Sequence, residues 1–194
     1  GTTTVEAGTL LVNGTHSGGG AYTVQSGGTL GGNGTIGTAD ADVTIQSGGR
    51  LVPGASIGTL TFDLGSGTLD LSAMQPGDLE FELGTPDASD QVVLTSGTLD
   101  IGSLGLDDFT FLPEAGFGVG DYVLFDSATE ILGSIDAAHA EGSVGGLQAT
   151  LWIDGAANDV VLSTVPEPSA LLLAALGTLG LACRRRYTGR RRAR

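Results

Sequence analysis

The chain has 194 residues, which is enough for one domain; 34 of them are glycine and only 5% are aromatic. This composition predicts a β-rich protein and excludes a helical bundle. Residues 1–165 hold a single basic residue, Arg50, against 21 acidic ones, so this acidic segment repels nucleic-acid phosphates and anionic lipid, which excludes nucleic-acid binding by it. The sequence begins without Met or an apolar leader, so we expect a fragment whose secretion signal lies upstream.

Residues 1–60 contain three similar segments that start at Val5, Val24 and Ile45, which are 19 and 21 residues apart. Each segment has a β-branched residue, a polar pair, one or two glycines and then Leu. This order fits a short strand, a tight corner and a second strand, and the spacing fits stacked repeats. We therefore predict a Gly-rich parallel β-helix or solenoid for residues 1–60, with a Gly-rich antiparallel β-sandwich as the alternative.

Residues 61–163 alternate apolar and polar side chains, which predicts strands with one buried face. The tripeptide Gly-Thr-Leu recurs and leads into these runs. We expect a β-rich acidic body here, built as a solenoid or an irregular sandwich. The alternating segments, the first of which starts at Leu60, are 60–64, 69–71, 79–83, 99–101, 109–111 and 151–153.

Residues 164–194 differ from the body. Val165-Pro-Glu-Pro168 interrupts the β pattern, because proline lacks a backbone donor. Residues 170–183 carry no charge, and arginines follow directly. We predict a single short transmembrane helix, about 21 Å long, whose flanking arginines stay in the cytoplasm by the positive-inside rule. A buried core helix is the alternative, which so many arginines disfavour.

Val165-Pro-Glu-Pro-Ser169, a short apolar helix and an arginine cluster together resemble the PEP-CTERM sorting signal of Gram-negative bacteria, a tail also labelled the ice-binding protein C-terminal domain. That label does not itself imply ice binding. The resemblance implies export, a transient stay in the inner membrane, and processing by an exosortase, a membrane protease-transferase. It makes Pro166, Glu167 and Pro168 the recognition motif and Arg184, Arg185 and Arg186 the stop-transfer block. It also implies release of the body to the cell surface or an exopolysaccharide matrix.

The repeats in residues 1–60 resemble autotransporter-associated β-strand repeats of large surface proteins. With the tail, they lead us to expect a structural or adhesive surface protein rather than an enzyme. One alternative is the C-terminal part of a carbohydrate-active enzyme or binding module whose active domain lies upstream. Another is ice binding by rows of threonines, which rests on Thr59 and Thr61.

Candidate catalytic and metal-ligating residues are few. His16 and His139 lack partners at metal-ligand spacing, and Cys183 is the only cysteine, so no zinc or thiol site and no internal disulfide is predicted. Several acids alternate with apolar residues, as a solvated sheet face would, which disfavours a catalytic carboxylate pair. These acids are Asp63, Asp70, Glu80, Glu82 and Asp100.

Calcium is the one cofactor that the sequence does not exclude, because acidic residues lie near predicted turns. Asp40 with Asp42, and Asp107 with Asp108, lie near predicted turns, where oxygen ligands can gather. Neither pair fits a known calcium-binding loop motif, so we predict solvated surface and no cofactor. The glycines of residues 31–34 do not form a phosphate loop, because no Lys-Ser/Thr follows them.

Overall fold

The computed structural model of the protein describes residues 1–167. Those residues form strands and one three-residue 3-10 helix, η1 (Leu106–Asp108), with no α-helix among them, so the predicted all-β class is confirmed. In chain order the strands are β1 (Thr3–Val5), β2 (Gly8–Leu11), β3 (Thr15–His16), β4 (Tyr22–Val24), β5 (Gly28–Gly32), β6 (Thr35–Gly37), β7 (Val43–Ile45), β8 (Arg50–Pro53), β9 (Thr59–Asp70), β10 (Leu79–Thr85), β11 (Ala88–Ser89), β12 (Gln91–Leu104), β13 (Phe109–Pro113), β14 (Gly120–Ser127), β15 (Ile131–Ile135), β16 (Glu141–Val144), β17 (Leu147–Asp154) and β18 (Asp159–Val165).

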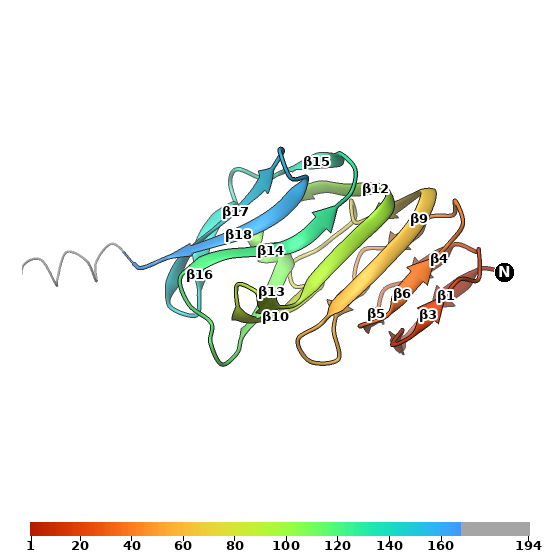
Figure 1. Ribbon diagram of the computed structural model, residues 1–194, viewed down its shortest axis with the longest axis horizontal. Helices are drawn as coiled ribbons and strands as arrows, with labels where there is room; N and C mark the ends of the chain where they lie inside the picture. Colours follow the sequence, from red (N-terminus) through yellow and green to blue (C-terminus); the bar gives the residue numbers. More distant parts are fainter. Residues whose placement is uncertain (168–194) are drawn as a thin grey trace, which may run out of the picture.

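The strands up to β15 stack as successive turns of a coil, with nearly all of their pairing parallel (Figure 1). Each turn contributes one strand to each of three columns, and each strand pairs with its equivalent one turn later. Val5 lies opposite Val24, which lies opposite Ile45, so the three similar segments of the sequence are neighbours in the stack. The columns are β1, β4, β7, β9, β12 and β15; β2, β5, β8, β10 and β13; and β3, β6, β9, β12 and β14.

Strands β9 and β12 appear in two columns because each is long and bent. The first part of β9 pairs with β6 and its last residues pair with β7, so one strand forms two sides of the coil. Glycines allow the bend. A Cβ atom on Gly97 would lie 2.6 Å from the carbonyl oxygen of Gly67, and one on Gly67 would lie 2.4 Å from that of Ala41. Consecutive turns therefore touch backbone to backbone at this corner, which only glycine permits.

The core is a column of large side chains inside the coil. The alternating segments point their apolar residues inward; Leu60, Phe62 and Leu64 have no exposed surface, whereas Asp63 between them is exposed. Equivalent residues of successive turns stack on one another, as along the second column. That row is Leu10, Leu30, Leu51, Leu79 and Phe109.

An antiparallel meander follows the last turn of the coil. β18 lies between β14 and β17, antiparallel to both, and β16 pairs with the outer edge of β17. Leu162 of β18 and Leu151 of β17 are buried in the same core as the coil. The meander thus covers one end of the stack, and Figure 1 shows β18 leading away from the molecule at the end opposite the N-terminus.

No helix within residues 1–167 combines the length and hydrophobicity needed to cross a membrane. The predicted transmembrane helix at residues 170–183, the motif residue Pro168 and the stop-transfer residues Arg184–Arg186 lie outside the described residues.

Candidate sorting site at the end of the body

The first two residues of the predicted recognition motif follow the last strand without a spacer. β18 ends at Val165, which lies opposite Gln148 of β17, and Pro166 and Glu167 come next. Proline cannot donate to a sheet ladder, which explains why the strand ends here. The motif therefore begins directly after the end of an interior strand of a folded sheet.

Thr164, the residue before Val165, is held more firmly than an ordinary strand residue. Its side chain is 1% exposed. Its hydroxyl donates to the carbonyl oxygen of Gly118 at 2.7 Å and accepts from the backbone N–H of Gly120 at 3.1 Å. Thr164 thus ties the end of β18 to the loop that leads into β14.

That loop is itself fixed from the other side. The Tyr122 hydroxyl accepts from the backbone N–H of Gly118 and donates to its carbonyl oxygen, both at 2.9 Å. The ring of Phe117 stacks on Tyr122 with centroids 5.5 Å apart. Tyr122 is fully buried, whereas Gly118 and Gly120 are partly buried, so the loop that Thr164 contacts is anchored to the core through Tyr122.

Asp40 and Asp42, for which the sequence left calcium binding open, hydrogen-bond across the corners between successive turns. Asp40 accepts from the backbone N–H and the hydroxyl of Ser66, at 2.8 and 3.0 Å, and Asp42 accepts from the backbone N–H of Thr68 at 2.8 Å. The hydrogen bonds from Ser66 lower the pKa of the Asp40 carboxyl. Each carboxylate therefore stabilises the stacking of one turn on the next.

The acids on the sheet faces, most of them partly buried, make similar local contacts. Asp70 accepts from the N–H of Ser72 at 2.9 Å, and Asp100 from that of Gly102 at 2.9 Å. Asp63 accepts from the Ser96 hydroxyl at 2.5 Å. Glu80 pairs with Arg50 at 2.6 Å, so the basic residue of the body is engaged in an ion pair. Glu82 lies beside Asp90 in a hollow that Glu80 also lines.

Asp90 is the most perturbed of these carboxyls. The pKa of Asp90 is raised to about 6. Burial is the main cause, the nearby charges of Glu82 and Glu80 act in the same direction, and hydrogen bonds from the N–H groups of Glu82 and Gly58, both 2.8 Å, oppose the shift. Both of its oxygens are thus occupied by backbone donors. Asp90, directly before β12, thus links the segment before β9 to β10 through Gly58 and Glu82. Its position in the sequence does not reveal this role.

The other candidate residues are dispersed. His16 hydrogen-bonds to Tyr22 in the first turns of the coil, whereas His139 pairs with Asp136 at 2.6 Å near the meander. That bond and the charge of Asp107 raise the pKa of His139. Asp108 accepts from the N–H of Gly105 at 2.8 Å.

Thr59 and Thr61 lie on β9, where Thr61 is opposite Thr35. Among residues 1–167 no three His, Cys, Asp or Glu side chains are placed to hold a metal ion.

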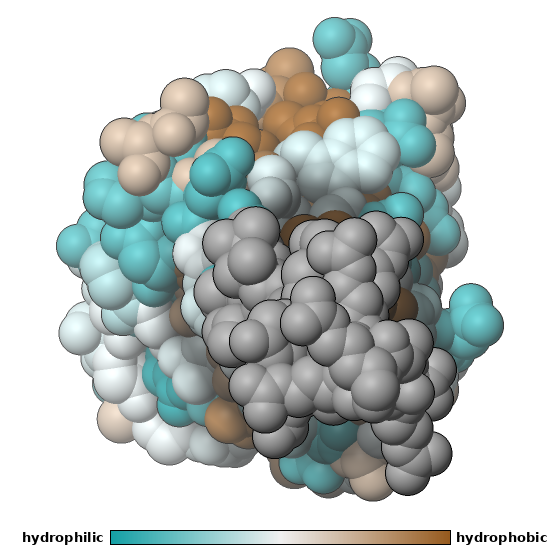
Figure 2. Space-filling model, turned by 90° about the vertical axis from the view of Figure 1, so that its left-hand side faces the viewer, coloured by the Kyte–Doolittle hydropathy of each residue, from teal (hydrophilic) through white to brown (hydrophobic). Residues whose placement is uncertain are grey.

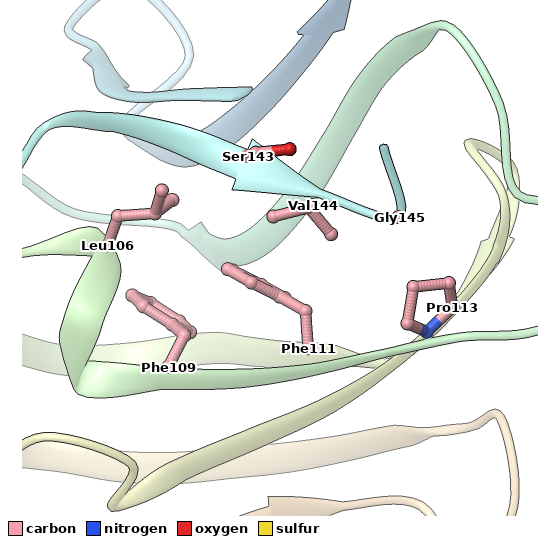
Figure 3. Close-up of a pocket in the computed structure, with 7 residues that line it drawn as sticks. All are labelled: Leu106, Phe109, Phe111, Pro113, Ser143, Val144 and Gly145. Carbon is pink, nitrogen blue, oxygen red and sulfur yellow. The ribbon is translucent and has the colours of Figure 1, made fainter. Parts of the chain in front are cut away.

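Several hollows on the described residues are open to solvent. One of about 220 Å³ lies between β13 and β16 (Figure 3) and is lined mainly by apolar side chains, with Phe109 and Phe111 stacked 5.0 Å apart. Figure 2, which views the end where the chain leaves the body, shows hydrophobic residues along the upper rim and hydrophilic residues around much of the visible surface.

The PEP-CTERM protein-sorting motif matches residues 164–186. The match implies exosortase-dependent sorting of an exported protein, with exosortase as the processing partner, and indicates a cell-surface or extracellular destination in Gram-negative bacteria. No curated protein and no solved structure shows significant similarity to the chain.

The matched region begins inside the folded body, at Thr164 and Val165 of β18. The sequence identified Pro166–Pro168 but not the role of Thr164, which reads as one threonine in a strand. Its partners at Gly118 and Gly120 are more than forty residues away in the chain, so no local pattern could have revealed the contact.

Proposed function

We propose that the chain is a non-enzymatic structural or adhesive protein of the cell surface or exopolysaccharide matrix, delivered there by exosortase through its C-terminal tail. The observation that carries the proposal is the sorting-motif match at residues 164–186, which starts at the last strand of a closed, acidic body. The tail determines where the protein goes, and the body is the cargo.

Each part of the tail has its own role in the proposal. Pro166, Glu167 and Pro168 are read by the exosortase. Residues 170–183 hold the protein in the inner membrane during processing, and Arg184–Arg186 stop its transfer. The charge asymmetry supports this orientation, because seven arginines lie at residues 184–194 and the acidic body lies on the other side of the apolar stretch.

The body serves as a rigid spacer or display element. Stacked turns joined by parallel pairing make a stiff rod-like unit, and copies of such a unit can present the same surface many times. Its acidic exterior favours solubility. The partner we propose is an exopolysaccharide or another component of the surface matrix, and the likeness of residues 1–60 to autotransporter-associated repeats stays a prediction.

The sorting role is tested by replacing Pro166, Glu167 and Pro168 together with alanine in a host that has an exosortase. We expect the unprocessed chain to accumulate in the inner membrane. The three residues follow the last strand, so the body should unfold at the same temperature as in the original protein. Release of the body at the normal rate would refute the assignment of the motif.

The matrix role is tested with the released body and the exopolysaccharide of the same host. We expect the body to sediment with the polysaccharide and to release no soluble sugar. Release of reducing sugar would overturn the non-enzymatic assignment, and failure to bind would overturn the adhesive one.

A further inference from the structure

The sorting motif and the folded body share residues. The match starts at Thr164, and Thr164 and Val165 are the last two residues of β18. Thr164 lies opposite both Gly120 of β14 and Ala149 of β17, and Val165 lies opposite Gln148. The residues immediately before Pro166 are therefore already hydrogen-bonding partners inside a sheet.

A protease engages its substrate as an extended segment whose backbone groups pair with the enzyme. Cleavage near Pro166 requires access to residues on its N-terminal side as well. In the folded body the backbone of these residues is paired within the sheet, and Thr164 is 1% exposed. An exosortase that bound them would have to replace contacts that the sheet already makes.

We propose that the end of β18 is a latch that controls exosortase access: Thr164 and Val165 must leave the sheet before the motif can be processed. The latch consists of Thr164, Val165 and their partners Gly118, Gly120 and Gln148. This inference rests on the proposed sorting function and adds a controlling step to it. Thr164 and Val165 are positioning residues, because they determine whether the motif is accessible and take no part in the cleavage chemistry.

Opening the latch does not require unfolding of the body. Val165 is 48% exposed and ends the ladder, so it separates easily, whereas Thr164 keeps two hydrogen bonds to the loop before β14. Strand ends of this kind open locally at a fraction of the global unfolding free energy. When such opening is faster than cleavage, the processing rate follows the population of the open form.

Weakening the latch should speed processing. In Thr164→Val the side chain keeps its shape but loses the hydroxyl, and we expect the precursor to be processed about tenfold faster, as the loss of one buried hydrogen-bonded group would give. Thr38→Val is the matched control. Thr38 is also fully buried and donates to the Ala41 carbonyl oxygen, but it lies on another corner of the coil, so its loss should leave the processing rate unchanged.

Locking the latch should stop processing. Gln148 and Val165 are directly opposed on antiparallel strands, where Cα atoms are about 4.5–5.5 Å apart, within the range that a disulfide spans. The pair Gln148→Cys and Val165→Cys, with Cys183→Ser to prevent wrong pairing, should slow processing more than about tenfold in the oxidised state and regain the original rate on reduction. Each single cysteine variant controls for the substitution itself.

A spacer should make processing independent of the latch. With Gly-Ser-Gly-Ser inserted between Val165 and Pro166, we expect fast processing that neither Thr164→Val nor the disulfide alters. The readout is pulse-chase conversion of precursor to the shorter form in a host with an exosortase. Processing of the oxidised disulfide variant at the original rate would overturn the latch. Failure to process the spacer variant and the original chain alike would overturn the sorting function itself.

Discussion

The close stacking of turns at Gly97 offers a direct test of how the body is built. In Gly97→Ala the added Cβ atom would lie 2.6 Å from the carbonyl oxygen of Gly67 and 2.8 Å from the Cβ atom of Leu64. The backbone at Gly97 also has φ of +97°, which disfavours any residue with a side chain. The substitution therefore combines backbone strain with a clash between turns.

Gly27→Ala separates these two effects. Gly27 has a similar φ of +85°, but a Cβ atom there would meet nothing within 4 Å. Backbone strain alone should cost about 1–2 kcal/mol in both variants. The clash at Gly97 should add about 1–3 kcal/mol, because overpacking forces the neighbouring backbone to shift.

The assay is equilibrium urea denaturation of the full chain, followed by far-UV circular dichroism. With a urea slope of about 1–3 kcal/mol/M, the extra cost should lower the midpoint of Gly97→Ala by about 1 M relative to Gly27→Ala. Equal midpoints for the two variants would show that the turns do not approach as closely as described, and would refute the stacking argument.

Two further predictions concern the interior. Leu51 is fully buried in the core, whereas Leu132 is 49% exposed, so Leu51→Ala should lower the unfolding free energy by about 2–5 kcal/mol and Leu132→Ala by much less; comparable losses in urea denaturation would contradict the assigned core. Burial raises the folded pKa of Asp90 from 3.8 to about 6, so folding takes up a proton and the free energy of unfolding should fall as the pH rises through that window. Urea denaturation at several pH values should show a less steep fall in Asp90→Asn than in the original chain. The same slope in both proteins would contradict the buried position of Asp90.

The all-β class of the body could be predicted because the repeat spacing and the alternation of apolar and polar residues are visible in the order of the residues. Val5, Val24 and Ile45 recur at the length of one turn and lie opposite one another in the stack. The alternating segments likewise bury the side chains expected. These features depend on spacing along the chain, which the sequence displays directly.

Other features depend on contacts between distant residues. The segments 60–64 and 69–71 look like separate strands, yet residues 59–70 form one bent strand. The bend falls at Gly65 and Gly67, where the register of pairing with β12 shifts between Asp63 and Thr68. Asp90 and Thr164 look like ordinary polar residues, and their roles appear only when their partners are placed beside them.

The tail differs from these features, because its signal lies in neighbouring residues of the chain. Its motif was recognised from consecutive residues, from Val165 to the arginines that start at Arg184, and the sorting match agrees with it. What the sequence did not reveal is that the match overlaps the last strand. The relation between sorting and folding follows from the structure of β18 and not from the motif.

The most direct test of the account is the mass of the body released from a host with an exosortase. We predict a polypeptide that ends at or next to Pro166–Pro168 and lacks residues 170–194. A released protein that still ends at Arg194 would show that the tail is neither removed nor used as a sorting signal, and would contradict the account.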